Sequence, residues 1–129
     1  MPTVKTSTMK AKYNMNKNKH AKAFETNKLK KGEKVLDCIE GYIGDMMGKG
    51  KDTQHNGSLI LTNDRVSFYR KGFFGEVIRN IPLRKISSVD YDSTLGHKTI
   101  ELHATYDSIR FKSFMNVNNF VGNLDEVRQ

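Results

Sequence analysis

The sequence predicts a mainly β protein: a seven-stranded antiparallel barrel, capped by a C-terminal α-helix and preceded by a basic, partly helical N-terminal arm. Two observations carry this prediction. Short segments of alternating apolar and polar residues recur between residues 34 and 112, separated by turn residues. The apolar spacing then changes to three and four residues, which is typical of an amphipathic helix. An antiparallel sheet of many short strands must curl, and a terminal helix can cover its open end.

The seven strands are expected at residues 34–43, 58–62, 65–70, 76–81, 85–93, 97–104 and 108–112. Asn63 and Asp64 suit a two-residue turn, because both tolerate positive φ. In the third strand the side chains alternate, with Val66 and Phe68 on one face and Arg65, Ser67 and Tyr69 on the other. The loop at 44–56 contains three glycines but lacks the spacing of a phosphate-binding loop.

Two positions interrupt the regular strand pattern. Pro82 ends the fourth strand or places it at a sheet edge, because proline cannot donate to the ladder. The apolar parity changes between Ile86 and Val89, which predicts a bulge or a sharp bend in the fifth strand.

The helix is expected at 116–128 with Asn116 as its N-cap. Its apolar face consists of Val117, Phe120, Val121, Leu124 and Val127. Gly122 and Asn123 weaken this helix, so it needs a surface to dock against.

The excess positive charge lies entirely in the N-terminal quarter. The net charge is +8, residues 1–34 contain ten Lys and two Glu, and the remainder contains twelve Lys or Arg and twelve Asp or Glu. The chain therefore divides into a basic arm, residues 1–31, and a neutral domain, residues 32–129. The arm lysines considered for binding are Lys10, Lys12, Lys17, Lys19, Lys22, Lys28, Lys30 and Lys31. A short helix is expected within 17–29, with a thin apolar face that includes Phe24. The arm is interpreted either as solvated, with Phe24 and Leu29 attached to the domain, or as a basic segment for acidic partners.

The bulk composition limits the function classes. With 129 residues and 36% apolar content, the chain has room for one domain, and no apolar run approaches the roughly 18 residues of a membrane span. The basic start has no signal-peptide core, so we expect a cytoplasmic protein. The single Cys38 excludes an internal disulfide and a thiol-rich metal site, and we interpret it as a small buried hydrophobe.

Three sequence blocks in order carry a family resemblance: GSLILTNDRVSF at 57–68, KGFFG at 71–75 and IPLRKISSV at 81–89. Over about residues 30–128 the chain resembles the YokE-like bacterial pleckstrin-homology (PH) domain family. The resemblance implies a PH-like barrel of bacterial or phage origin, no enzyme activity and no ligand common to the family. PH domains that bind phosphoinositides carry a basic cluster across the first two strands. Here the loop between them offers only Lys49 and Lys51, so specific phosphoinositide binding is not expected.

The residues offer little for catalysis. His97 and His103 share a strand face but would lie about 20 Å apart, too far for one metal. Asp90, Asp92 and Asp107 are interpreted as solvated strand ends, and Glu101 with His103 as an ordinary surface pair. We therefore expect no enzyme, no cofactor, no metal and no small-molecule substrate.

The aromatic hairpin is the first candidate binding site. Phe73 and Phe74 stand together at a turn, and we expect Arg70, Lys71 and Arg79 to surround them, with Lys49 and Lys51 as further cations. Such a tip suits an anionic membrane, nucleic-acid bases or a protein partner. In the alternative interpretation one Phe folds over the barrel mouth and the other packs on the helix or a second copy.

These features support several binding hypotheses. The first is a binding or adaptor module for a protein partner or for homo-oligomer assembly. The second is peripheral attachment to an anionic membrane through the arm and the hairpin. The third is nucleic-acid binding through the arm, with Tyr13 and Phe24 as stacking groups. A phage inhibitor of a host system also fits the sequence.

Overall fold

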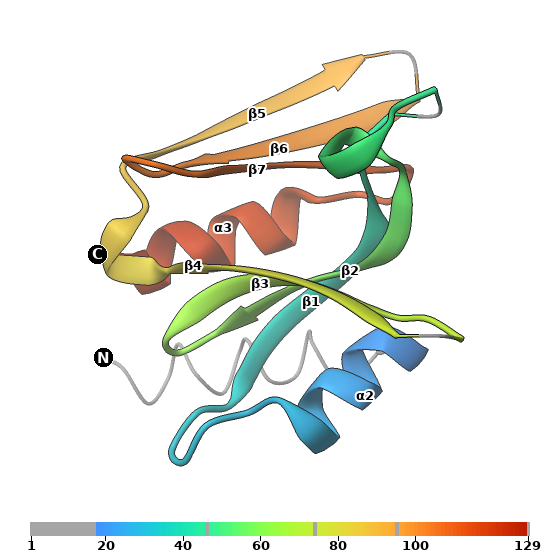
Figure 1. The fold of residues 1–129 in the computed structure, drawn as a ribbon. Helices are drawn as coiled ribbons and strands as arrows, with labels where there is room; N and C mark the ends of the chain where they lie inside the picture. Colours follow the sequence, from blue (N-terminus) through green and yellow to red (C-terminus); the bar gives the residue numbers. More distant parts are fainter. Residues whose placement is uncertain (1–17, 46, 74, 95, 129) are drawn as a thin grey trace.

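The computed structural model describes residues 18–128, apart from residues 46, 74 and 95 and the side chains of Lys51 and Thr94. Within this part, seven strands form one antiparallel sheet in the order β4-β3-β2-β1-β7-β6-β5 (Figure 1). Their bounds are β1 Val35–Ile43, β2 His55–Thr62, β3 Arg65–Lys71, β4 Glu76–Pro82, β5 Ser88–Thr94, β6 His97–His103 and β7 Ser108–Ser113. The predicted mainly β, seven-stranded architecture is confirmed.

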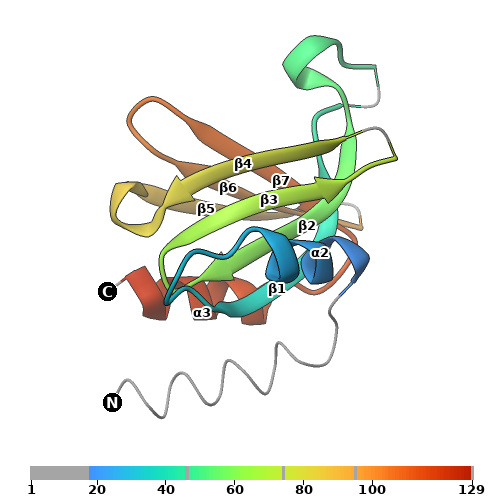
Figure 2. The same ribbon diagram turned by 60° about the horizontal axis from the view of Figure 1, so that its bottom comes forward.

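Strand β1 joins the two halves of the curled sheet. It pairs with β2 over most of its length, and near its end Tyr42 and Ile43 pair with Lys112 and Phe111 of β7. The halves pack face to face around one continuous core (Figure 2). Within it, the rings of Phe68 and Phe111 meet with centroids 6.2 Å apart.

Helix α3, Asn118–Arg128, closes one opening of the barrel with the apolar face that the sequence predicts (Figure 1). The helix begins two residues later than predicted, so Asn116 precedes the N-cap position, and its side chain accepts a hydrogen bond from the Asn118 N–H at 2.9 Å. Asn123 does more than weaken the helix. It is buried, and its Nδ2 donates to Asp37 Oδ2 of β1 at 2.8 Å, so this polar pair ties α3 to the sheet.

Two strands begin three residues away from the predicted start, and the other strand bounds agree with the prediction to within one residue. Strand β2 begins at His55 because the ladder continues opposite β1, with Gly57 facing Gly41. A Cβ at Gly41 would lie 2.2 Å from the Lys112 carbonyl oxygen of β7, so there is no room for a side chain at position 41 of β1. Residues Leu83–Lys85 form a 3-10 turn (η2) after Pro82, and β5 starts only at Ser88. The parity change at Ile86 therefore marks the entry to the strand, and the prediction of a bulge there is wrong.

The helix expected within 17–29 is present as α2, Lys19–Asn27, and it packs on the outer face of β2 and β3 (Figure 2). Its apolar face is small, but Ala21 and Phe24 are fully buried in a second apolar cluster with Ile60 and Tyr69. The face of β3 that carries Arg65, Ser67 and Tyr69 is thereby covered. Residues 18–31 of the expected arm thus lie against the sheet, while residues 1–17 lie outside the described part.

Candidate functional site

One end of the barrel gathers several connections that are distant in sequence. It contains the β1–β2 loop, the β3–β4 turn, the β7–α3 connection and the first turn of α2, at the right of Figure 1. We call it the loop end. Large apolar side chains on three of these connections are exposed: Met47 by 88%, Phe73 by 93% and Phe114 by 70%.

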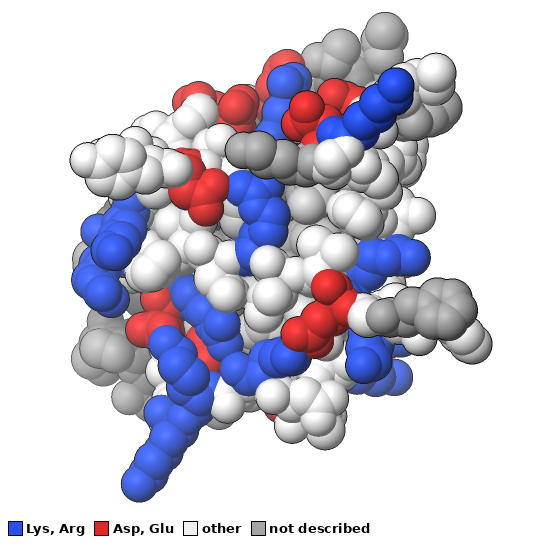
Figure 3. All heavy atoms as spheres, in the orientation of Figure 1, with Lys and Arg blue, Asp and Glu red and all other residues white. Residues whose placement is uncertain are grey.

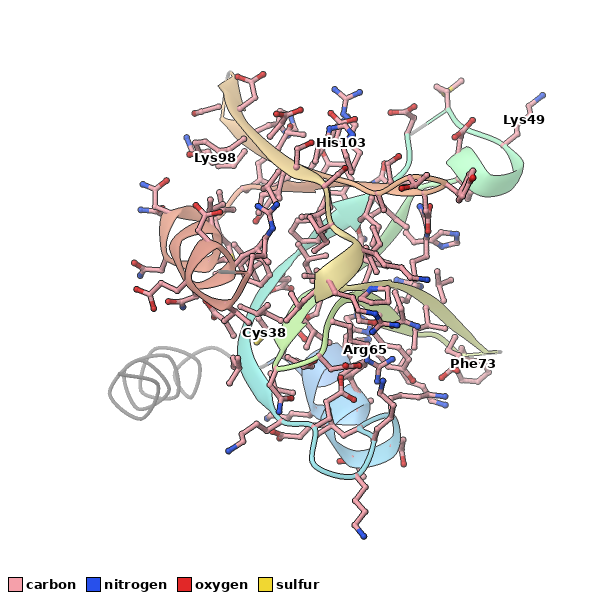
Figure 4. All side chains as sticks on the ribbon, turned by 90° about the vertical axis from the view of Figure 1, so that its left-hand side faces the viewer. Cys38, Lys49, Arg65, Phe73, Lys98 and His103 are labelled. Carbon is pink, nitrogen blue, oxygen red and sulfur yellow. The ribbon has the colours of Figure 1, made fainter. Side chains whose placement is uncertain are left out.

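The β3–β4 turn forms a projecting tip. Strand pairing ends at Lys71 and Glu76, and the Gly72 N–H closes the turn by donating to the Gly75 carbonyl at 2.7 Å. Phe73 extends away from the barrel, on the same side as Lys49 of the β1–β2 loop (Figure 4). The predicted exposure of an aromatic residue at this turn therefore holds for Phe73, whereas Phe74 lies outside the described residues.

Cations from two elements stand at the base of the tip. Arg70 is fixed by donation from Nη1 to the Asn56 carbonyl at 2.9 Å, and Lys71 is exposed. The Lys71 N–H donates to His20 Nδ1 at 3.0 Å, which holds the first turn of α2, and with it Lys19, beside the tip. Sequence reasoning missed Lys19 as a neighbour of the tip, because 51 residues separate His20 from Lys71.

Arg79 does not join this group. Its Nη2 donates to Asp107 Oδ1 at 2.7 Å and to the Ser108 carbonyl at 2.6 Å. It therefore links β4 to the start of β7 beside a cleft lined by Asp52, His55, His103 and Tyr106. The expectation that Arg79 surrounds the aromatic tip is wrong, because its side chain crosses the open side of the barrel.

The arm lysines divide into three groups. Lys19, Lys22 and Lys31 are exposed, and Lys and Arg side chains gather over the lower half of Figure 3, where α2 lies. Lys28 pairs with Glu76 at 2.6 Å, and Lys30 pairs with Asp64, so these two also fasten the arm to the sheet. Lys10, Lys12 and Lys17 lie outside the described residues, as does the side chain of Lys51.

A buried ion pair holds the segment after α2 in place. Arg65 donates from Nε and Nη2 to the two carboxylate oxygens of Glu33, at 2.8 and 3.0 Å. Glu33 also accepts from Thr62 Oγ1 at 2.7 Å and from the Lys30 N–H at 3.0 Å, and its side chain is only 2% exposed. The Arg65 guanidinium carbon lies 5.0 Å from the centroid of the Phe24 ring, and Arg65 points toward α2 in Figure 4. This network makes α2 an integral part of the outer face.

Comparison with known proteins agrees with this architecture. The sequence model of the family described as "Bacterial PH domain" matches residues 29–122, most of the chain. The chain belongs to the bacterial PH domain family. PH domains are generally binding modules without catalytic activity. The match begins just after α2, so this helix lies outside the matched region.

The fold is similar to that of a solved structure, the Vps36 N-terminal PH domain, at a TM-score of 0.59. The identity is 15%, and the similarity covers 78% of this chain and 82% of that chain, which shows a shared fold. No curated protein matches the sequence significantly. Among the helices that the structure describes in this PH domain, none is long and apolar enough to cross a membrane.

On the outer face of β5 and β6, Asp90 joins the Glu101–His103 pair that the sequence predicts. Ligand-capable atoms of Asp90, Glu101 and His103 lie within 4.8 Å of one another, and His103 Nε2 is 2.9 Å from Asp90 Oδ2. The cross-strand register places Asp90 opposite Glu101, which single-strand periodicity does not reveal. Because the Asp90 side chain is 72% exposed, we interpret the group as a solvated surface pair with a neighbouring carboxylate.

The stability of this PH domain is expected to fall in acid through Glu33. Burial by itself raises the pKa of Glu33, but hydrogen bonds from Arg65, Lys30 and Thr62 outweigh it and lower the pKa from 4.5 to about 2. Because the unfolded carboxyl binds protons first, this stabilisation is complete above about pH 4.5 and is lost as the pH falls toward about 2. Urea titrations across this range measure it. A Glu33→Gln variant with the same acid dependence as the wild type would contradict the assignment.

Proposed function

We propose that this bacterial PH domain is a non-catalytic binding module that attaches peripherally to an anionic membrane surface through the loop end. The observation that carries the proposal is the 93% exposure of Phe73 at a tip whose base carries Lys19, Arg70 and Lys71. An exposed aromatic ring can enter the headgroup region while cations beside it meet lipid phosphates. Each such cation contributes about 1 kcal/mol near an anionic surface.

The distribution of apolar side chains favours a membrane over a protein partner or a second copy of the chain. Met47 and Phe73 are exposed on two separate connections of the loop end, whereas Phe114 on a third packs against the rings of His97 and Tyr42. Protein interfaces instead concentrate their binding energy in packed clusters that fill pockets. Separate apolar residues interspersed with cations fit a soft anionic surface better.

The nucleic-acid hypothesis loses one of its two stacking groups. Phe24 is fully buried between α2 and the sheet, with its ring centroid 5.7 Å from that of Tyr69. A base has no access to this ring while α2 is docked. Tyr13, the other aromatic residue of that hypothesis, lies outside the described residues.

Sedimentation with phosphatidylglycerol-containing vesicles tests the proposal. Phe73→Ser is expected to weaken binding about tenfold, because entry of the ring into the interface contributes about 1.5 kcal/mol. Binding by the wild type should also fall with added salt, because the cations act through screened electrostatics. The matched control is Tyr106→Ser, since Tyr106 is 98% exposed but lies on the β6–β7 turn, away from the loop end. Equal binding by both variants and the wild type would overturn the proposal.

A further inference from the structure

His20 lies at the junction between α2 and the aromatic tip. Its side chain is buried at 7% exposure, and its Nδ1 accepts the Lys71 N–H at 3.0 Å. An accepting Nδ1 carries no proton, so the ring is neutral when α2 is docked. The first turn of α2 is therefore attached to the tip through a hydrogen bond that only the neutral histidine can make.

Charged groups on three elements act on this ring. Burial is the largest influence and lowers the pKa of His20; Lys19 of α2 and Arg70 of β3 lower it further, while Glu40 of β1 acts in the opposite direction. Lys71 supplies its N–H to the ring and is a further cation on β3. The two cations that oppose protonation of His20, Lys19 and Arg70, are also those that the proposed function places against lipid phosphates.

Anionic phosphates near Lys19 and Arg70 would offset their repulsion of a proton on His20. Protonation of Nδ1 then places two donors, Nδ1–H and the Lys71 N–H, opposite each other, so this hydrogen bond is lost. The new imidazolium adds one cation at the surface. Because binding linkage is reciprocal, a surface that favours the proton is also bound more tightly by the protonated protein.

We propose that His20 is a proton-dependent regulator of this PH domain, which makes attachment to anionic lipid stronger in mild acid because its protonation adds a cation beside the β3–β4 tip. The proposal rests on the proposed function. The expected gain from one added cation is about fivefold in vesicle affinity.

The test compares binding of the full chain to phosphatidylglycerol-containing vesicles at about pH 7.5 and about pH 5.5, on either side of the ordinary histidine range. The test variant is His20→Asn, in which the amide oxygen replaces Nδ1 as acceptor but does not titrate. The wild type should gain about fivefold more affinity on acidification than this variant. His103→Asn, on the outer face of β6, is the control and should retain the wild-type gain.

The outcomes separate the regulator from the proposed function. If the wild type binds vesicles and His20→Asn gains as much affinity on acidification, the role of His20 as a regulator is contradicted. Membrane attachment itself is then still supported. Absence of vesicle binding at both pH values would overturn both. A histidine NMR titration adds a direct readout, since the pKa of His20 should rise when vesicles are added. An unchanged pKa in vesicle-bound protein would also overturn the regulator.

Discussion

Replacing Glu33 with alanine is expected to lower the free energy of unfolding by about 3–5 kcal/mol, the usual cost of breaking one side of a buried ion pair. The substitution leaves the Arg65 guanidinium at 11% exposure without its carboxylate and removes the nearer of two acceptors of Thr62 Oγ1. Urea denaturation followed by circular dichroism measures the loss. Lys31→Ala is the matched control, because Lys31 is an exposed residue of the same turn.

A second comparison separates charge from hydrogen bonding in this network. Glu33→Gln keeps an oxygen acceptor for Thr62 and Arg65, so it should cost less than Glu33→Ala. Replacing Glu33 and Arg65 together by apolar residues should recover part of the loss, because no unpaired charge remains buried. A loss below about 1 kcal/mol for Glu33→Ala would show that the pair behaves like a surface salt bridge.

Replacing Phe24 with alanine is expected to cost about 3–5 kcal/mol, the range for truncating a buried aromatic side chain. Phe24 is fully buried, packs edge-on against Tyr69, and carries the Arg65 guanidinium over its face. The loss should appear first as release of α2, because Phe24 is the largest apolar side chain that the helix buries. Hydrogen exchange should therefore become faster in residues 19–27 than in the core strands.

The control for this substitution is Lys22→Ala, an exposed position on the same helix. If Phe24→Ala left the protection of residues 19–27 unchanged, the helix would not depend on this contact. Release of α2 also carries Lys19 away from the tip, so the same variant should bind anionic vesicles more weakly. That second readout connects the packing of the outer face to the proposed function.

The strands and α3 were predictable because their information is local. Alternation in β3 and β6 and the spacing of Val117, Phe120 and Leu124 follow directly from the periods of strand and helix. The exception shows the limit of this reasoning. Ile86 breaks the alternation, and the residues alone do not distinguish a bulge from the 3-10 turn that Leu83–Lys85 adopt after Pro82.

The candidate site was only partly predictable. The aromatic tip could be predicted, because Phe73 lies in a segment bounded by two glycines and close to Arg70 and Lys71 in the chain. The position of Arg79 was not, because its partner Asp107 is 28 residues away and follows from how the sheet curls. The docking of α2 was expected only in one of two interpretations of the arm, as attachment of Phe24 and Leu29 to the domain. Its own apolar face is thin, and its stability comes from the surface that β2 and β3 present.

The sequence by itself determined that seven strands curl and that an amphipathic helix covers an opening, because side-chain periodicity encodes which face is buried. Only the tertiary structure decided which polar residues meet. Glu33 with Arg65 and Asp37 with Asn123 are pairs 32 and 86 residues apart. Their partners are chosen by register and packing, and burial then raises the cost of leaving either member unpaired. The same process brought Lys19 and His20 to the tip, where we propose that this PH domain meets its membrane.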